Sequence, residues 1–478
     1  MIIAPKGTQA EVLALEPKGH IVVLGTAGSG KTTMALLRAE HLSNLEDNPK
    51  VLIVTFNRAL VAYMNNIQTT SRSRRVVVEN YHKFSLGYLN SAGKDTKFGT
   101  VLNDPQVKFD IIESILESAK AKYPKESTFA RPVQTFLDEI SFIQHFGVRT
   151  PEEYNEIVRV GRSDAYISRE KRKWFYAVYK KYIEIRATKG YLYDWDDLST
   201  FTYDALLQDE RPRLYKHIIV DEGQDFSPMM LKSLVHAIPA DGTFTFFGDV
   251  AQQIYGNALS WKSSGIDVQS RIHETKKIWK FENNYRNPYE VAIFAQDITK
   301  HQLWEAKDED YVTPKFERPA AGLKPTLVKY SDAMVETTAL VQLIKNNRSG
   351  RNVIIVKNRE ISAEIVQTLN RSGIYATEIK RETSSGVKDG VYVTTFHSAK
   401  GLEFDSVFIP YLNDDDFPDA EKLKATESEN IVYANALKLL YVAVTRAVQS
   451  VVMSYSGRLT RLFPVASANY VTVDKSGE

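Results

Sequence analysis

A glycine-rich segment near the start of the chain has the spacing of a phosphate-binding loop. Residues 25–32 read GTAGSGKT and fit the pattern G-x-x-x-x-G-K-[ST]. Glycines let the backbone wrap a phosphate, and the amides that open the next helix point toward it. Lys31 would reach the β- and γ-phosphates of a nucleotide, and the Thr32 hydroxyl would hold Mg²⁺. The nucleotide contacts predicted here are Gly25, Thr26, Ala27, Gly28, Ser29, Gly30, Lys31, Thr32 and Thr33.

Two carboxylates follow another apolar run, residues 218–220. Ligands of open parallel sheets bind at the carboxyl ends of the strands, which is where Asp221 and Glu222 would lie. Asp221 could hold Mg²⁺ directly or through water, and Glu222 could position or deprotonate the attacking water. Taken alone, the pair could also be an acidic helix start. Together with the loop, it predicts a nucleotide hydrolase.

The elements that must position these residues are short apolar strands that alternate with helices. Residues 21–24, 51–54, 218–220 and 244–247 are expected strands of a first parallel sheet. The run at 21–24 precedes the loop and a helix-favouring run follows it, although a plain strand–loop–helix turn is the alternative. A second set lies at 326–328, 352–356, 390–394, 406–409 and 450–454. The alternation predicts two α/β domains.

A helical insertion is expected inside the first domain. Between about residues 85 and 193 the strand pattern is lost and helical spacing takes over. The basic stretch at 168–174 is either a solvated helix face or a binding patch.

Composition excludes some classes of protein. The 478 residues carry a formal net charge of +2 and contain no cysteine. Disulfides and cysteine-based metal or redox sites are therefore absent, and any nucleic-acid site must be a local groove. No apolar run approaches the ~18 residues of a membrane span. We expect a cytoplasmic protein with no membrane partner.

Further strings, read in order, resemble the motifs of UvrD/Rep/PcrA helicases of superfamily 1. They are residues 55–60, 80–84, 193–198, 221–225, 248–256, 281–287, 394–404 and 440–447. The resemblance implies an α/β fold with two RecA-like parallel-sheet domains of the phosphate-loop NTPase class, and ATP between them.

The resemblance assigns ATP contacts outside the loop. Gln9 would read adenine, Tyr285 would stack on it, and Glu403 would bind ribose. The γ-phosphate would be met by Gln252 as a sensor, by Arg286 as a direct contact, and by Arg446 as an arginine finger from the second domain.

The resemblance also assigns contacts with the nucleic-acid strand, which are Phe56, Asn57, Arg58, His82, Tyr255, Trp261, Thr395, His397 and Ser398. Two departures from the family pattern stand out. Residues 257–260 lack a usual stacking aromatic, for which Trp261 is either a substitute or a core tryptophan. Gly223 replaces an aromatic residue or alanine, a change that we expect to be tolerated.

The family's second insertion, called 2B, is expected to be missing, because about 110 residues separate Arg286 from Lys400. We predict a first domain at 1–85 and 194–276, an insertion at 86–193, and a second domain at 277–478 with a loop near 380–390 in place of 2B. A partner protein could replace the missing domain.

The resemblance implies an ATP-dependent helicase that moves 3′→5′ on single-stranded DNA and acts on 3′-tailed duplex. The alternative is a DNA-stimulated ATPase or translocase that does not unwind, as a subunit of a larger assembly for phage defence or repair. RNA is open as a substrate, because stacking and phosphate contacts accept both nucleic acids.

Overall fold

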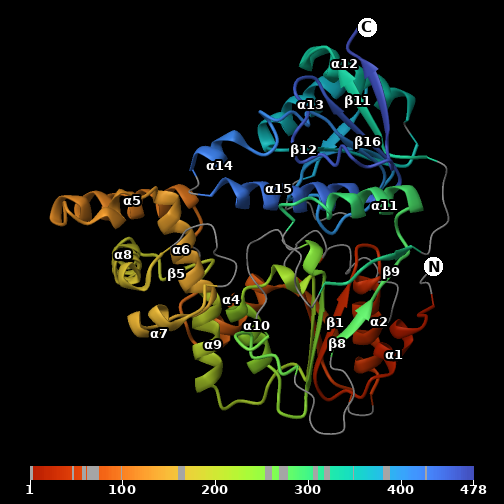
Figure 1. Ribbon diagram of the computed structural model, residues 1–478. Coiled ribbons are helices and arrows are strands. Elements are labelled where there is room, and N and C mark those ends of the chain that lie inside the picture. Colours follow the sequence, from red (N-terminus) through yellow and green to blue (C-terminus); the bar gives the residue numbers. More distant parts are fainter. Residues whose placement is uncertain are drawn as a thin grey trace.

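Two parallel sheets, one above the other, form the body of the molecule, and a helical block projects to one side (Figure 1). A computed structural model describes residues 4–45, 48–55, 61, 75–97, 99–159, 167–252, 261–268, 278–304, 311–316, 323–347, 349–379, 388–425 and 428–477. The predicted α/β class with two parallel sheets is confirmed.

The first sheet has the strand order β3-β2-β6-β7-β1-β8 with every pairing parallel. Its strands are β1 (Gly19–Gly25), β2 (Val51–Thr55), β3 (Val76–Asn80), β6 (His217–Asp221), β7 (Thr243–Gly248) and β8 (Ile278–Phe281). The central strands are β-branched and apolar because helices cover both faces. These helices are α1 (Thr8–Ala14), α2 (Lys31–Ser43), α4 (Tyr81–Ser91), α9 (Leu198–Gln208) and α10 (Pro228–His236).

The second sheet has the order β13-β14-β12-β15-β16-β11-β17, again parallel. Its strands are β11 (Thr326–Tyr330), β12 (Arg351–Val356), β13 (Ala376–Glu378), β14 (Gly390–Thr395), β15 (Phe404–Ile409), β16 (Ala447–Tyr455) and β17 (Val471–Lys475). Its helices are α11 (Tyr289–Ile298), α12 (Ala333–Asn346), α13 (Arg359–Arg371), α14 (Ala420–Ala425) and α15 (Glu429–Val444). Helices α11 and α15 lie on the side of this sheet that faces the first domain (Figure 1).

The insertion forms its own apolar core. It contains α5 (Pro105–Lys122), α6 (Val133–His145), α7 (Pro151–Glu156) and α8 (Arg169–Thr188). Phe136 and Phe175 stack at its centre with ring centroids 4.4 Å apart. Two short parallel strands close its base, β4 (Val101–Leu102) on β5 (Tyr193–Asp194).

Two elements cross the predicted domain boundaries. Helix α4 crosses the predicted start of the insertion at residue 86, but it packs on α9 of the first domain, so the insertion begins near β4. Strand β8 follows the predicted end of the first domain at 276, yet it pairs with β1. Beyond it, β9 (Asn283–Asn284) pairs with β10 (Lys315–Phe316). A single edge element of this kind carries little periodic signal in the sequence.

The basic stretch at 168–174 supplies structural contacts to the insertion. Arg172 is buried and its Nη1 donates to the carbonyl oxygens of Tyr154, Asn155 and Ile157 at 2.6, 3.0 and 2.9 Å. Lys171 pairs with Glu126 at 2.6 Å. The centre of the stretch therefore holds the end of α7, while Arg169, Glu170 and Lys173 are exposed to solvent.

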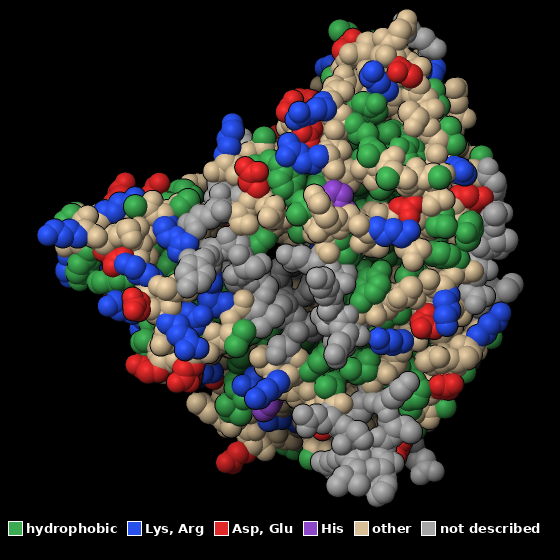
Figure 2. Space-filling view, viewed as in Figure 1, with side chains coloured by type: hydrophobic (Ala, Val, Ile, Leu, Met, Phe, Trp, Pro, Cys, Tyr) green, Lys and Arg blue, Asp and Glu red, His purple; other side chains and the backbone are tan. Residues whose placement is uncertain are grey.

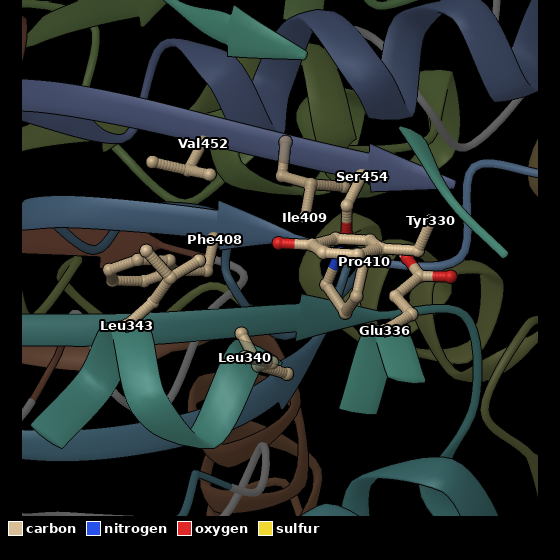
Figure 3. Close-up of a pocket in the computed structure, with 9 residues that line it drawn as sticks. All are labelled: Tyr330, Glu336, Leu340, Leu343, Phe408, Ile409, Pro410, Val452 and Ser454. Carbon is tan, nitrogen blue, oxygen red and sulfur yellow. The ribbon is translucent and has the colours of Figure 1, made fainter. Parts of the chain in front are cut away.

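A small cavity of about 10 Å³ lies inside the second domain, between α12 and its sheet (Figure 3). It is lined by apolar side chains and by buried Glu336, whose Oε1 accepts hydrogen bonds from Tyr411 N (2.8 Å) and Ser454 Oγ (2.6 Å). Space for about one water molecule excludes a substrate site there. Among the described residues, no helix is long and apolar enough to cross a bilayer.

Candidate nucleotide site

The phosphate loop lies between β1 and α2 and touches the segment that leads into the second domain. Gly28 has φ +69°, and a Cβ there would lie 2.5 Å from Asn284 Oδ1 and 2.6 Å from Arg286 Cβ. Tyr285 N also donates to Gly28 O at 2.9 Å. The second glycine of the loop is therefore required by this close approach as well as by its left-handed backbone.

Lys31 is buried within its own loop. Its ammonium donates to the carbonyl oxygens of Gly25 at 3.0 Å and Thr26 at 2.7 Å, and pairs with Asp249 at 3.3 Å. These acceptors hold the Lys31 side chain inside the loop, where phosphate oxygens could replace the two carbonyls.

Thr32 and Asp221 form the oxygen donor set that Mg²⁺ prefers. The Thr32 hydroxyl donates to Asp221 Oδ2 at 2.8 Å, while the buried Oδ1 has no hydrogen-bond partner among the described residues. Burial, and then repulsion from Glu222, raise the pKa of Asp221 to about 7. A bound cation would offset the burial and the repulsion that disfavour the ionised Asp221 carboxylate. Mg²⁺ takes few protein oxygens beside phosphate and water, so these residues fit it.

Glu222 lies beside this pair in a left-handed backbone conformation, with φ +53°. Burial acts to raise its pKa, but Lys400, Lys31 and a hydrogen bond from Gln224 outweigh it and keep the pKa below its usual value. Gln224 Nε2 donates to Glu222 at 2.5 Å, and Gln224 Oε1 accepts from Asp249 N at 2.8 Å. An ionised, oriented carboxylate suits the positioning of a water molecule.

Steric crowding explains why glycine occupies position 223 in this chain. A Cβ at this position would lie 2.2 Å from Cε2 of Phe246, whose ring is fully buried in the first core. The aromatic side chain on β7 thus occupies the space that a residue at 223 would need.

Gly223→Ala is expected to lower the free energy of unfolding by about 1–3 kcal/mol through overpacking. The urea midpoint of the whole chain measures it. Gly87→Ala is the matched control, because nothing lies within 4 Å of the Cβ added in α4. Phe246→Leu should restore part of the loss in the double variant. An unchanged midpoint for Gly223→Ala contradicts the steric explanation.

Arg446 reaches from the second domain into the first. Its Nη2 donates to Gln252 Oε1 at 2.7 Å, and Gln252 Nε2 donates to Asp249 Oδ2 at 2.6 Å. Burial lowers the pKa of Arg446 to about 10, so the guanidinium is still charged at neutral pH. The predicted sensor and the predicted arginine finger therefore touch each other across the domain interface.

Lys400 makes a second contact across this interface, which the sequence analysis did not assign. Its ammonium donates to Asp225 Oδ1 at 2.6 Å and to the carbonyl oxygen of Gln252 at 2.7 Å. Both members of the ion pair are buried. The only sequence signal was a lysine inside the string 394–404, because the two charges are far apart along the chain.

Arg286 and Glu403, the predicted γ-phosphate and ribose contacts, pair with each other. Glu403 Oε1 accepts from Arg286 Nε at 2.7 Å and lies 2.6 Å from Nη2. Asn287, also missed, fastens the same turn, because its amide donates to the carbonyl oxygens of Thr445 at 3.1 Å and Ala447 at 2.5 Å, on either side of Arg446.

A cavity of about 430 Å³ opens beside the loop and contains the predicted adenine contacts. Gln9, Ser29 and Tyr285 line it. Gln9 Nε2 donates to Ser29 O at 3.0 Å, so the glutamine amide is held against the phosphate loop. The volume and position suit a nucleoside.

Comparison with known proteins decides the family. The UvrD/REP helicase N-terminal domain matches residues 6–277, and the UvrD-like helicase C-terminal domain matches residues 375–458. The chain belongs to the UvrD/Rep helicase family. The RecA-like character of its two sheets, expected from the motifs, is thereby confirmed.

Individual UvrD-type relatives are distant and longer. YjcD of Bacillus subtilis is 27% identical over 60% of this chain and 37% of its own length. The mitochondrial ATP-dependent DNA helicase HMI1 of Saccharomyces cerevisiae is 23% identical over 77% of this chain and 52% of its own. UvrD2 of Mycobacterium tuberculosis is 22% identical over 78% and 55%. The chain thus spans about a third to a half of these curated relatives.

The strand contacts expected for a UvrD-type chain are only partly within the described residues. Phe56, Asn57, Arg58 and Tyr255 lie outside them. His82 is the second residue of α4 and meets half-buried Trp195 edge to face, with ring centroids 4.9 Å apart. Sequence analysis placed Trp195 in a motif without giving it a role.

In the second UvrD-type domain, Thr395 ends β14 and its hydroxyl donates to Ser398 Oγ at 3.2 Å, in the same turn as His397. Trp261 packs edge-on against Phe246 at 5.1 Å on the first core. This contact favours the core interpretation of Trp261 over strand stacking.

Proposed function

We propose that this chain is an ATP-dependent motor that moves 3′→5′ along single-stranded DNA and unwinds 3′-tailed duplex. The contact of Arg446 with Gln252 carries the proposal, because it brings an arginine of the second domain to the wall that holds the phosphate loop. Such an arginine can stabilise the charge that develops when the γ-phosphate is transferred. The family match supports the same activity.

ATP would occupy the space between the loop and the second domain. Its base would enter the cavity beside Gln9 and Tyr285, and its phosphates would replace the loop carbonyls around Lys31. Thr32 and Asp221 would hold Mg²⁺, which neutralises phosphate charge when bound. Glu222 would orient the attacking water and accept its proton.

Hydrolysis would be coupled to movement through the interface. Arg286 and Arg446 would bind the γ-phosphate from the second domain, so ATP would favour the closed arrangement and product release would relax it. Arg286 must leave Glu403 to do so, which frees that carboxylate for the ribose. Lys400 would couple domain closure to DNA binding, because it contacts Asp225 and Gln252 of the first domain. It also follows the turn at 395–398, which holds the proposed DNA contacts.

The strand would cross both domains above the carboxyl ends of the parallel strands. His82 and Trp195 would contact it on the first domain, and Thr395, His397 and Ser398 on the second, together with Phe56, Asn57, Arg58 and Tyr255. Lys and Arg side chains gather on the insertion side of the visible face (Figure 2). Stacking and phosphate contacts of this kind grip a strand without reading its sequence.

A non-unwinding translocase within a larger assembly is the second candidate. Within the described parts of the second domain, β13 and β14 are adjacent parallel strands, with only residues 379–389 between them. That connection leaves no room for a second inserted domain, whose place a partner protein would take.

The decisive experiment measures ATP hydrolysis without nucleic acid and with single-stranded DNA, RNA or duplex, then unwinding of duplexes with 3′ or 5′ tails. We expect stimulation by single-stranded DNA and unwinding only from the 3′ tail. Stimulation without unwinding supports the translocase, and preferential stimulation by RNA overturns the DNA assignment. Hydrolysis indifferent to every nucleic acid overturns the motor.

A further inference from the structure

Arg38 is a fully buried arginine that the proposed mechanism does not use. It lies in α2, seven residues after Lys31, or about 10 Å further along the helix axis. Its Nη1 donates to the carbonyl oxygens of Val12 at 2.8 Å, Leu13 at 3.3 Å and Leu15 at 3.4 Å. Burying an arginine costs free energy unless hydrogen-bond acceptors compensate for the lost water, and these three carbonyls are such acceptors.

The three carbonyls belong to the carboxyl end of α1. This helix has only 7 residues, too few to be stable alone, and its last carbonyls have no partner within the helix. A guanidinium there satisfies several of them and complements the helix dipole. Burial lowers the pKa of Arg38 to about 10, which leaves it charged at neutral pH.

The opposite end of α1 carries the proposed adenine reader. Gln9 is its second residue, and Lys6 N donates to Gln9 Oε1 at 3.3 Å while Gln9 Nε2 donates to Ser29 O at 3.0 Å. Arg38 Nε also donates to Thr245 Oγ1 of β7 at 3.3 Å. One side chain thus ties α1 to the phosphate-loop helix and to the sheet.

We propose that Arg38 is a positioning residue for base selection: it fixes α1 so that the Gln9 amide meets the edge of adenine. The inference rests on the proposed function, because it needs ATP as substrate and Gln9 as the base reader. A packing role alone would make Arg38 matter for stability and leave selectivity unchanged.

The test compares Gln9→Ala, Arg38→Met, Arg38→Lys and the double variant Gln9→Ala/Arg38→Met, with saturating single-stranded DNA. The readout is kcat/KM for ATP divided by that for inosine triphosphate, whose base presents a carbonyl in place of the 6-amino group. Two lost hydrogen bonds of ~1 kcal/mol each predict a fall of at least about 10-fold in Gln9→Ala.

Arg38→Met should lower the same ratio through KM for ATP more than through kcat, and Arg38→Lys should recover part of it. The double variant should be no worse than Gln9→Ala, because both changes act through one amide. Inhibition by tripolyphosphate, which has no base, should stay unchanged. If thermal unfolding shows that Arg38→Met is not folded, the comparison is made with Arg38→Lys and with the double variant Gln9→Ala/Arg38→Lys.

An unaltered ratio in the Arg38 variants, a multiplicative loss in the double variant, or weakened tripolyphosphate inhibition overturns this inference. With selectivity still lost in Gln9→Ala, such results leave the proposed function intact. Absence of ATP hydrolysis in the unaltered chain, or selectivity untouched by Gln9→Ala, instead overturns the assignment on which both depend.

Discussion

Arg446→Ala is expected to lower kcat for DNA-stimulated ATP hydrolysis by ~10³–10⁵, the contribution of an arginine finger to phosphoryl transfer. The guanidinium enters a buried interface and touches the predicted sensor, Gln252, at 2.7 Å. Its charge would oppose that of the γ-phosphate in the transition state. The affinity for ATP should change much less than kcat, because the arginine acts most strongly on the transition state.

Two controls separate catalysis from folding in this prediction. Arg446 also donates to Val442 O at 3.0 Å, so its removal could disturb the end of α15, and thermal unfolding must show that the variant is folded. Arg446→Lys keeps a charge but has one ammonium in place of the planar fork, so it should recover only part of kcat. A folded Arg446→Ala variant with normal kcat contradicts the assignment of Arg446.

Lys31→Ala is expected to reduce kcat/KM for ATP by at least ~10²–10³, the usual cost of removing one charged donor from a preorganised site. The ammonium is held by the loop carbonyls of Gly25 and Thr26 and by Asp249. The variant should fold, because Asp249 keeps hydrogen bonds from Gln252 Nε2 at 2.6 Å and Ala251 N at 3.1 Å. Binding of single-stranded DNA should remain, since its proposed contacts lie elsewhere.

Steady-state hydrolysis and DNA binding by fluorescence anisotropy measure this prediction on the same preparation. Lys181→Ala is the matched control, because this lysine is 59% exposed on α8 and forms a surface ion pair with Glu184 at 2.9 Å. It should leave hydrolysis unchanged. DNA-stimulated hydrolysis that survives Lys31→Ala contradicts the phosphate-loop assignment.

The phosphate loop and the buried strands could be predicted from the sequence because their chemistry is local. The phosphate loop needs glycines, a lysine and a threonine at fixed spacing, and the buried strands that carry the loop and Asp221 are uninterrupted apolar runs. Strands 21–24 and 218–220 were predicted in this way and are confirmed within β1 and β6. The family resemblance rested on ordered strings of the same local kind.

Edge elements and long-range partners were decided by the tertiary structure. Strand β8 joined the first sheet because β1 offered it an edge, which its own short sequence does not reveal. The family resemblance implied a role for Arg446 at the ATP site, but its contact with Gln252, 194 residues away, exists only because the two domains fold against each other. The same is true of Lys400 with Asp225, 175 residues apart.

Contacts between buried charges that are far apart in the sequence cannot be predicted from the sequence alone. A lysine or arginine in a string looks the same whether water or a distant carboxylate satisfies it, and only packing removes the water. Arg38 shows this most clearly, since it reads as an ordinary polar position of α2 and instead fastens α1 beside the phosphate loop. The sequence by itself predicted which groups could bind and cleave a nucleotide, and only the tertiary structure decided what holds them in place.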